Sequence, residues 1–169
     1  MASLKSFCPI VGYVALILTV VLLNPSLGRA ADDALLQALS SRHFKSSTAD
    51  LEKAAGSQDA LVQRLLELRT QETPPFAGIR AEKILLNYAD RSDVQAALQS
   101  DIESTRFPGL ARIIAANIDA VSHTDTRRKL AELAIARSSR ETDFAPLARN
   151  LRNSTDSNVS TLAKQAFSE

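Results

Sequence analysis

From Asp32 to the end of the chain, apolar residues recur at steps of three and four, with polar residues between them. This spacing gathers apolar side chains on one side of an α-helix, whereas a half-buried strand requires strict alternation. The sequence therefore predicts an all-α protein of about eight helices and no sheet. The groups that share a helix face are Leu61, Val62, Leu65 and Leu66; Val94, Ala97, Leu98 and Ile102; Leu110, Ile114, Ile118 and Val121; Leu130, Leu133 and Ala134; Phe144, Leu147 and Leu151; and Val159, Leu162, Ala163 and Ala166.

The breaks between these groups carry residues that are typical of helix boundaries. Serine, threonine and aspartate side chains accept hydrogen bonds from the first free N–H groups of a helix, and proline interrupts one. We therefore expect helix boundaries at Ser57, Pro74-Pro75, Ser92-Asp93, Pro108-Gly109, Thr124-Asp125, Thr142-Asp143 and Thr155-Asp156.

The predicted helices also repeat. A shift of about 32 residues aligns apolar positions of successive segments, and it aligns Arg80 with Arg112. A period of this size is typical of stacked helix hairpins, each too small to bury its apolar face alone. An irregular helical bundle with chance matches remains the alternative. The aligned sets are Val62, Val94, Thr126 and Val159; Leu66 or Leu65, with Leu98, Leu130 and Leu162; and Leu86, Ile118 and Leu151.

One unit resembles a known repeat. The residues Ile79-Arg80-Ala81, Leu85-Leu86, Asp93-Val94 and Ala97-Leu98 are similar to the helix–turn–helix unit of HEAT-like repeats. Residues 110–136 and 144–167 follow the pattern more loosely, and Asn117 and Asn150 depart from it. The resemblance implies a short α-solenoid of HEAT-like hairpins over residues 58–167, whose concave side commonly binds another protein. It implies no catalytic residues, because the family has none in common.

The N-terminus has the layout of a secretory signal peptide. An apolar run of fourteen residues, Ile10–Leu23, follows Lys5 and ends at Asn24-Pro25. Small residues then offer a cut after Ala30 or after Gly28. A membrane-spanning helix needs about 18 to 20 apolar residues, so cleavage is favoured over an uncleaved anchor. Either outcome predicts an exported protein, periplasmic or secreted.

Three regions follow from this organisation. Residues 1–30 form the signal peptide or anchor, 31–57 an N-terminal capping helix or a tether, and 58–169 the HEAT-like repeat domain. The only cysteine, Cys8, lies in the first region. The exported domain therefore depends on packing rather than on disulfides.

Charge excludes some classes of partner. Removal of residues 1–30 takes away Lys5 and Arg29 and no acidic residue, so the 20 Lys and Arg of the whole chain become 18 against 19 Asp and Glu. A nucleic-acid binder would be strongly basic on one face. We expect no nucleic acid as partner, and a membrane only if the N-terminal segment stays uncleaved.

No motif for catalysis, metal binding or a cofactor is recognisable. His43 and His123 are the only histidines and are eighty residues apart, which predicts no metal site. The chain has no Gly-x-Ser-x-Gly turn and no glycine-rich phosphate loop. Acidic pairs such as Glu67 with Glu72 are explained by solvated helix faces. The sequence predicts no enzyme and no cofactor.

The basic residues of 127–140 have two interpretations. Arg127, Arg128, Lys129, Arg137 and Arg140 either recognise an anionic partner or lie on a solvated face balanced by Glu132 and Glu141. The second interpretation is favoured.

The sequence favours a non-catalytic adaptor or scaffold that holds another envelope or secreted protein in a preformed groove. A small-ligand or lipid carrier is the main alternative, ahead of an enzyme. Polar or aromatic groups at repeat-equivalent positions are the candidate binding residues, namely Arg80, Tyr88, Arg112, Asn117, Arg127 and Arg128.

Overall fold

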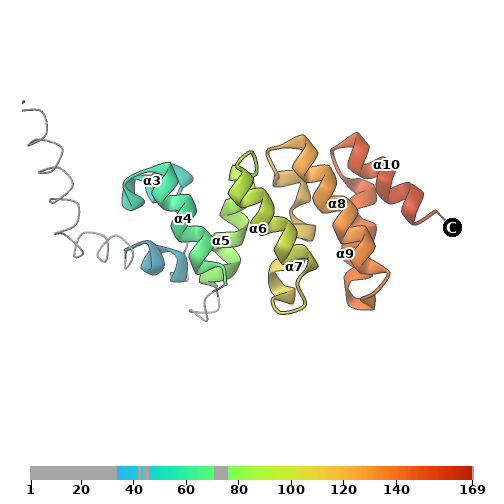
Figure 1. Ribbon diagram of the computed structural model, residues 1–169, viewed down its shortest axis with the longest axis horizontal. Helices are drawn as coiled ribbons and strands as arrows, with labels where there is room; N and C mark the ends of the chain where they lie inside the picture. Colours follow the sequence, from blue (N-terminus) through green and yellow to red (C-terminus); the bar gives the residue numbers. More distant parts are fainter. Residues whose placement is uncertain (1–33, 42, 44–45, 71–75, 169) are drawn as a thin grey trace, which may run out of the picture.

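The computed structural model describes residues 34–41, 43, 46–70 and 76–168, and all regular structure in them is helical (Figure 1). The prediction of an all-α class is confirmed, since these residues contain no strand. Residues 34–40 form a first helical segment. The α-helices that follow are α3 (Thr48–Ala55), α4 (Gln58–Leu68), α5 (Ala77–Leu85), α6 (Ser92–Glu103), α7 (Pro108–Ala116), α8 (Thr124–Ser138), α9 (Ala145–Asn150) and α10 (Ser157–Ala166). Short 3-10 helices are η1 (Leu86–Tyr88), η2 (Ile118–Ala120), η3 (Thr142–Phe144) and η4 (Leu151–Asn153).

From α4 onward the α-helices form two layers. Consecutive helices pair as hairpins, α4 with α5, α6 with α7 and α8 with α9. In one layer α4, α6, α8 and α10 pack side by side, and in the other α5, α7 and α9 do so. Figure 1 shows the helices in a row, with α3 and α10 at opposite ends. The substantial contacts of each helix are therefore made within its hairpin and with the next one.

Positions that align at a shift of about 32 residues have the same place in successive hairpins. Val62, Val94, Thr126 and Val159 are all buried, one on each helix of the first layer. Leu86, Ile118 and Leu151 are also buried, and each begins the 3-10 turn that follows a helix of the second layer. The hydroxyl of Thr126, the one polar member, donates to the backbone oxygen of Ala89 over 3.2 Å.

The N-terminal residues share the core of the hairpins. Leu35 and Leu39 of the first helical segment and Leu51 of α3 are buried in the same apolar cluster as Leu61 and Leu65 of α4. Gly56 ends α3 with a φ of 89°, a conformation that favours glycine because it has no Cβ. The predicted signal peptide, residues 1–30, lies outside the described residues. Within the described residues no helix is long and apolar enough to cross a membrane.

Helix starts agree with several predicted boundaries. Ser57 accepts a hydrogen bond from the backbone N–H of Ala60 at the start of α4, and Asp156 accepts from Asn158 and Val159 at the start of α10. At α8 the cap is His123 rather than Thr124 or Asp125: its Nδ1 accepts from the backbone N–H of Thr126 over 3.3 Å. The ring of His123 is half-buried in this position.

The two helices of the first hairpin, α4 and α5, are in close contact at Gly78. Gly78, in the first turn of α5, lies against the end of α4, and a Cβ at this position would be only 2.9 Å from the backbone oxygen of Arg69. Glycine therefore lets α5 pack directly on the end of α4.

Candidate functional site

A groove of about 700 Å³ lies between the N-terminal residues and the first hairpin. Helix α5 and η1 form one wall, and the segment that leads into α3 forms the other. Two apolar side chains, Leu51 and Ile84, contribute to its lining. The complete lining is His43, Ser46, Ser47, Thr48, Leu51, Arg80, Lys83, Ile84, Asn87 and Ala120.

The wall formed by α5 is a single helix face. Arg80, Lys83, Ile84 and Asn87 follow the spacing i, i+3, i+4 and i+7, which brings their side chains together. The other side of α5 is buried in the core through Ala77, Ala81 and Leu85, among others. The stretch from 80 to 87 is about 10 Å long at 1.5 Å per residue, about the length of three residues of extended chain.

The lining of this groove is basic. Three of the lining residues have basic side chains, namely Arg80, Lys83 and His43, and none is acidic. Asp50, which neighbours the lining in α3, already accepts hydrogen bonds from the backbone N–H and hydroxyl of Ser47. These hydrogen bonds lower the pKa of Asp50. The groove therefore favours an anionic occupant.

Arg80 has a second role as a tie between the two walls. Its Nη1 donates to the backbone oxygens of Leu39 and Ser41, so it joins α5 to the end of the first helical segment. Its guanidinium also lies 5.7 Å from the ring centre of Phe76, within the range of a cation–π contact. Of the six predicted binding residues, Arg80 alone lines this groove.

Tyr88 and Asn117 are used in the fold. Tyr88 is 4% exposed, and its hydroxyl donates to a carboxylate oxygen of Glu52 over 2.7 Å, which joins η1 to α3. Burial and this hydrogen bond both raise the pKa of Tyr88. The side-chain amide of Asn117 donates to the backbone oxygen of Ile113 at the end of α7, over 2.8 Å. Both side chains are thus engaged within the fold, Tyr88 with another helix and Asn117 with the end of its own.

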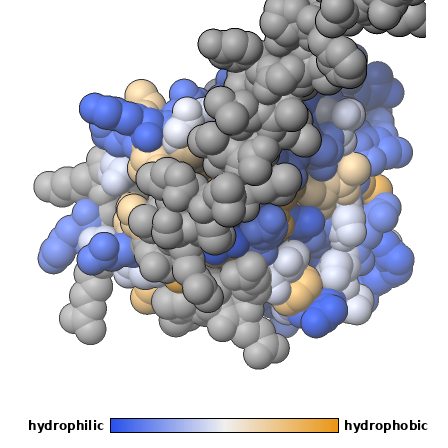
Figure 2. Space-filling model, turned by 60° about the vertical axis from the view of Figure 1, so that its left-hand side comes forward, coloured by the Kyte–Doolittle hydropathy of each residue, from blue (hydrophilic) through white to orange (hydrophobic). Residues whose placement is uncertain are grey.

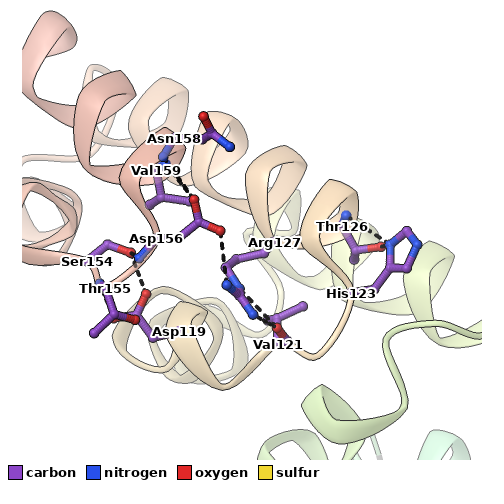
Figure 3. A network of polar contacts seen from close by, with 10 residues as sticks. All are labelled: Asp119, Val121, His123, Thr126, Arg127, Ser154, Thr155, Asp156, Asn158 and Val159. Atoms are coloured by element: carbon purple, nitrogen blue, oxygen red, sulfur yellow. Dashed lines mark hydrogen bonds and ion pairs between the residues drawn. The ribbon is translucent and has the colours of Figure 1, made fainter.

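Arg127 is a clamp between hairpins (Figure 3). Its Nε and Nη2 donate to the backbone oxygen of Val121, over 3.0 and 2.6 Å, and its Nη1 lies 3.0 Å from the carboxylate of Asp156, the N-cap of α10. In the same view Asp119 accepts from Ser154 and from the backbone N–H of Thr155. These contacts fix the start of α10 against α8 and η2.

Arg112 and Arg128 lie on the surface, each in an ion pair. Arg112 pairs with Asp143 over 3.8 Å, and its side chain is 54% exposed. Arg128 pairs with Glu132 of the same helix over 3.1 Å. Arg137, from the same basic run, is buried and donates to the backbone oxygens of Ile102 and Ser104. The basic residues of α8 thus do not form one patch.

A second polar cluster, which the sequence did not reveal, lies inside the first two hairpins. Glu82 of α5 and Asp101 of α6 are both buried, with Arg69 from the end of α4 beside them. Burial, then the charge of Asp101, raise the pKa of Glu82 to about 8, while Arg69 opposes the shift. The groove described above is not lined by Glu82 or Asp101.

The histidines belong to different environments. His43 is an exposed turn residue at the groove, and the ring of His123 is hydrogen-bonded to Thr126. Across the described ranges there is no group of three or more His, Cys, Asp or Glu side chains that could hold a metal ion.

Sequence reasoning missed most of the groove. It identified Arg80 but not Lys83, Asn87 or His43, although the i, i+3, i+7 spacing of the first two from Arg80 was available as a signal. The other wall depends on how the segment before α3 folds back, which the pattern does not encode.

Outside the grey atoms, the side of the molecule drawn in Figure 2 is mostly hydrophilic, with small apolar areas between.

No protein-family model matches this chain, and no curated protein or solved structure is significantly similar to it.

Proposed function

We propose that this chain is an exported, non-catalytic adaptor that holds a short acidic segment of another envelope or secreted protein in the groove between α5 and the N-terminal residues. The observation that carries this proposal is the charge of the groove. Three basic side chains and no acidic one line a volume of about 700 Å³. Complementary charge increases both the rate and the specificity of association.

The proposed fold is a short solenoid of HEAT-like hairpins. Two observations support it: the hairpins contact their neighbours in order, and positions about 32 residues apart have equivalent places. In such an arrangement each unit packs on the next, and the row of units presents an extended surface. The irregular bundle, in which helices far apart in sequence would also pack together, has less support.

Export is proposed from the sequence of residues 1–30. A basic start, the short apolar run Ile10–Leu23 and small residues after Pro25 are the supporting features. The partner would then be a protein of the same compartment.

The composition of the groove favours an acidic segment over a lipid. Its apolar lining is limited to Leu51, Ile84 and Ala120, while the other lining residues are polar or basic. A lipid carrier requires a largely apolar cavity. A small anionic ligand would contact the same basic groups. The crosslinking experiment below distinguishes such a ligand from an acidic protein segment.

The test measures binding of a labelled hexaglutamate peptide to the intact exported domain at low ionic strength. Lys83→Gln removes one groove charge, and we expect it to weaken binding by about 5- to 10-fold, an effect that salt reduces. The matched control is Lys129→Gln, at an exposed lysine of α8 that forms an ion pair with Glu132. Equal affinities of the two variants, or no binding at all, would contradict the proposal.

The second part identifies the natural occupant in intact cells. A photo-crosslinking residue at Asn87 would capture what lies in the groove. We expect one dominant protein that has an acidic segment at the crosslink, lost on Lys83→Glu and retained on Lys129→Glu. Capture of a small anion or an apolar lipid instead would replace the adaptor by a carrier.

A further inference from the structure

Glu82 has an unusual environment for an acidic side chain. Its exposed fraction is 0%, and no donor in the described residues reaches either of its carboxylate oxygens. An ionised carboxylate buried in this way would lose its hydration with nothing to replace it. A neutral carboxylic acid, by contrast, can donate its own proton to a neighbouring acceptor.

Asp101 is the acceptor that Glu82 needs. The two carboxyl groups belong to α5 and α6, and Arg69 from the end of α4 forms an ion pair with Asp101. The side chains of this pair are only 14% and 5% exposed. One cation thus serves two buried carboxyl groups. The charges balance when Asp101 is ionised and Glu82 carries a proton that it donates to Asp101.

The other charged groups on the packed helices are occupied or exposed. On α4, Asp59 pairs with Arg91 and Arg64 with Glu67. On α6, Asp93 pairs with Arg91, and Glu103 is exposed. Helix α7 contributes Arg112, which is paired with Asp143. On α5 itself, Arg80 and Lys83 line the groove on the other side of the helix. The charges that act on Glu82 are those of Asp101 and Arg69.

Close packing keeps water away from this cluster. Gly78 is one turn before Glu82, and a Cβ there would be 2.9 Å from the backbone oxygen of Arg69. The helices around Glu82 therefore have to separate before water can hydrate its carboxylate.

We propose that Glu82, Asp101 and Arg69 form a proton-controlled junction that holds α4, α5 and α6 together while Glu82 is protonated and loosens when the proton is lost. The junction lies on the side of α5 away from the groove. It can therefore be tested whether or not the groove binds a partner.

The direction of the pH effect follows from linkage. The pKa of Glu82 rises from 4.5 to about 8 on folding, so between these values Glu82 holds a proton in the folded chain that it does not hold in the unfolded chain. The stabilisation is complete below pH 4.5 and is lost as the pH rises through about 8. One proton corresponds to about a tenfold fall in the folding equilibrium constant per pH unit.

Glu82→Gln is the decisive variant, because its amide still donates to Asp101 but does not titrate. Denaturant unfolding from pH 5 to 9 gives the folding constant of each chain. We expect the ratio of wild type to Glu82→Gln to fall by about tenfold per unit between about pH 5.5 and 7.5. Glu103→Gln, an exposed carboxyl on α6, is the control and should give a flat ratio. A flat ratio for Glu82→Gln would overturn the proposal.

A measurement on the unmodified chain keeps the proposal testable if Glu82→Gln fails to fold. Infrared difference spectra should show the C=O stretch of one buried, protonated carboxyl group at pH 6 that is lost by about pH 9. Hydrogen exchange, corrected for its intrinsic pH dependence, should rise over the same interval in α4, α5 and α6 more than in α10. Absence of the protonated carboxyl at pH 6, or uniform exchange in all helices, would overturn it.

Discussion

Asp101 and Asp156 are both paired with an arginine at a contact between hairpins, yet their pKa values shift in opposite directions. The pairs are similarly covered: the side chains are 14% and 5% exposed for Arg69 and Asp101, and 19% and 9% for Arg127 and Asp156. Burial raises the pKa of Asp101 in spite of Arg69. Burial also acts to raise that of Asp156, but the backbone N–H groups of Val159 and Asn158, with Arg127, lower it overall.

The difference lies in the hydrogen-bond donors around each carboxylate. Asp156 begins α10 and receives two backbone N–H groups in addition to Arg127, so its negative charge is well solvated by the protein. Asp101 is near the end of α6, beside a second carboxyl group and with a single arginine. The carboxylate of the Arg127–Asp156 pair is therefore fully hydrogen-bonded in its ionised form. The carboxylate of the Arg69–Asp101 pair has fewer donors, and its environment changes when the neighbouring Glu82 loses its proton.

Loss of Arg69, which pairs with Asp101, should have the largest effect on stability. Arg69→Leu leaves Asp101 buried without a cation, and Glu82 still beside it. We expect a loss of about 3 to 5 kcal/mol in the free energy of unfolding at pH 7, measured with urea. The loss should shrink at pH 5, where Asp101 can take up a proton. A loss below about 1 kcal/mol at pH 7 would show that the pair is not buried in solution.

Loss of Arg127, which pairs with Asp156, should have a smaller effect on stability. Arg127→Leu removes the donors to Val121 and the ion pair, but Asp156 keeps its two backbone N–H groups. We expect a loss of about 2 kcal/mol that changes little between pH 5 and 7. The neighbouring Arg128→Leu, on the surface, should change stability by no more than about 0.5 kcal/mol. If Arg127→Leu were as harmful as Arg69→Leu, the two junctions would not differ as described.

The close approach at Gly78 gives the smallest of the three effects. Gly78→Ala places a methyl group 2.9 Å from the backbone oxygen of Arg69, so α4 and α5 must move apart. We expect a loss of about 1 to 2 kcal/mol in the free energy of unfolding. Gly109→Ala is the control in α7: a Cβ there has no neighbour within 4 Å, and helix propensity should make it neutral or stabilising by up to about 1 kcal/mol. Equal effects of the two substitutions would contradict the close packing.

The helices could be predicted from the sequence because their apolar positions form a local pattern. Val94, Leu98 and Ile102 lie on one face of α6 and are buried, as their spacing requires. The boundary at Ser57 is equally local. The cap of α8 was missed because histidine is a less common N-cap than the threonine and aspartate that follow it.

The polar sites could be predicted less well, since their contacts join residues about 30 positions apart. Glu82 follows Ala81 in a helix whose sequence does not mark this acid as buried, and only packing brings it to Asp101. Arg127 was a candidate as a polar group at a repeat-equivalent position, but it donates to the backbone oxygen of Val121, a contact that no pattern of residue types reveals. Arg80 was identified because it aligns with Arg112 in the repeat. The same position lies on the face of α5 that lines the groove.

The neighbour-to-neighbour order of the hairpins has a consequence for the evolution of the chain. Because α6 and α7 contact mainly the hairpins on either side, a unit of about 32 residues could be duplicated or deleted without rerouting the backbone. The polar bridges span the same interval, as from Arg91 to Asp59 and from Arg69 to Asp101, so each bridge joins one unit to the next and a duplicated unit would carry only one of its two partners. Evolution could thus lengthen or shorten this protein by whole units of about 32 residues.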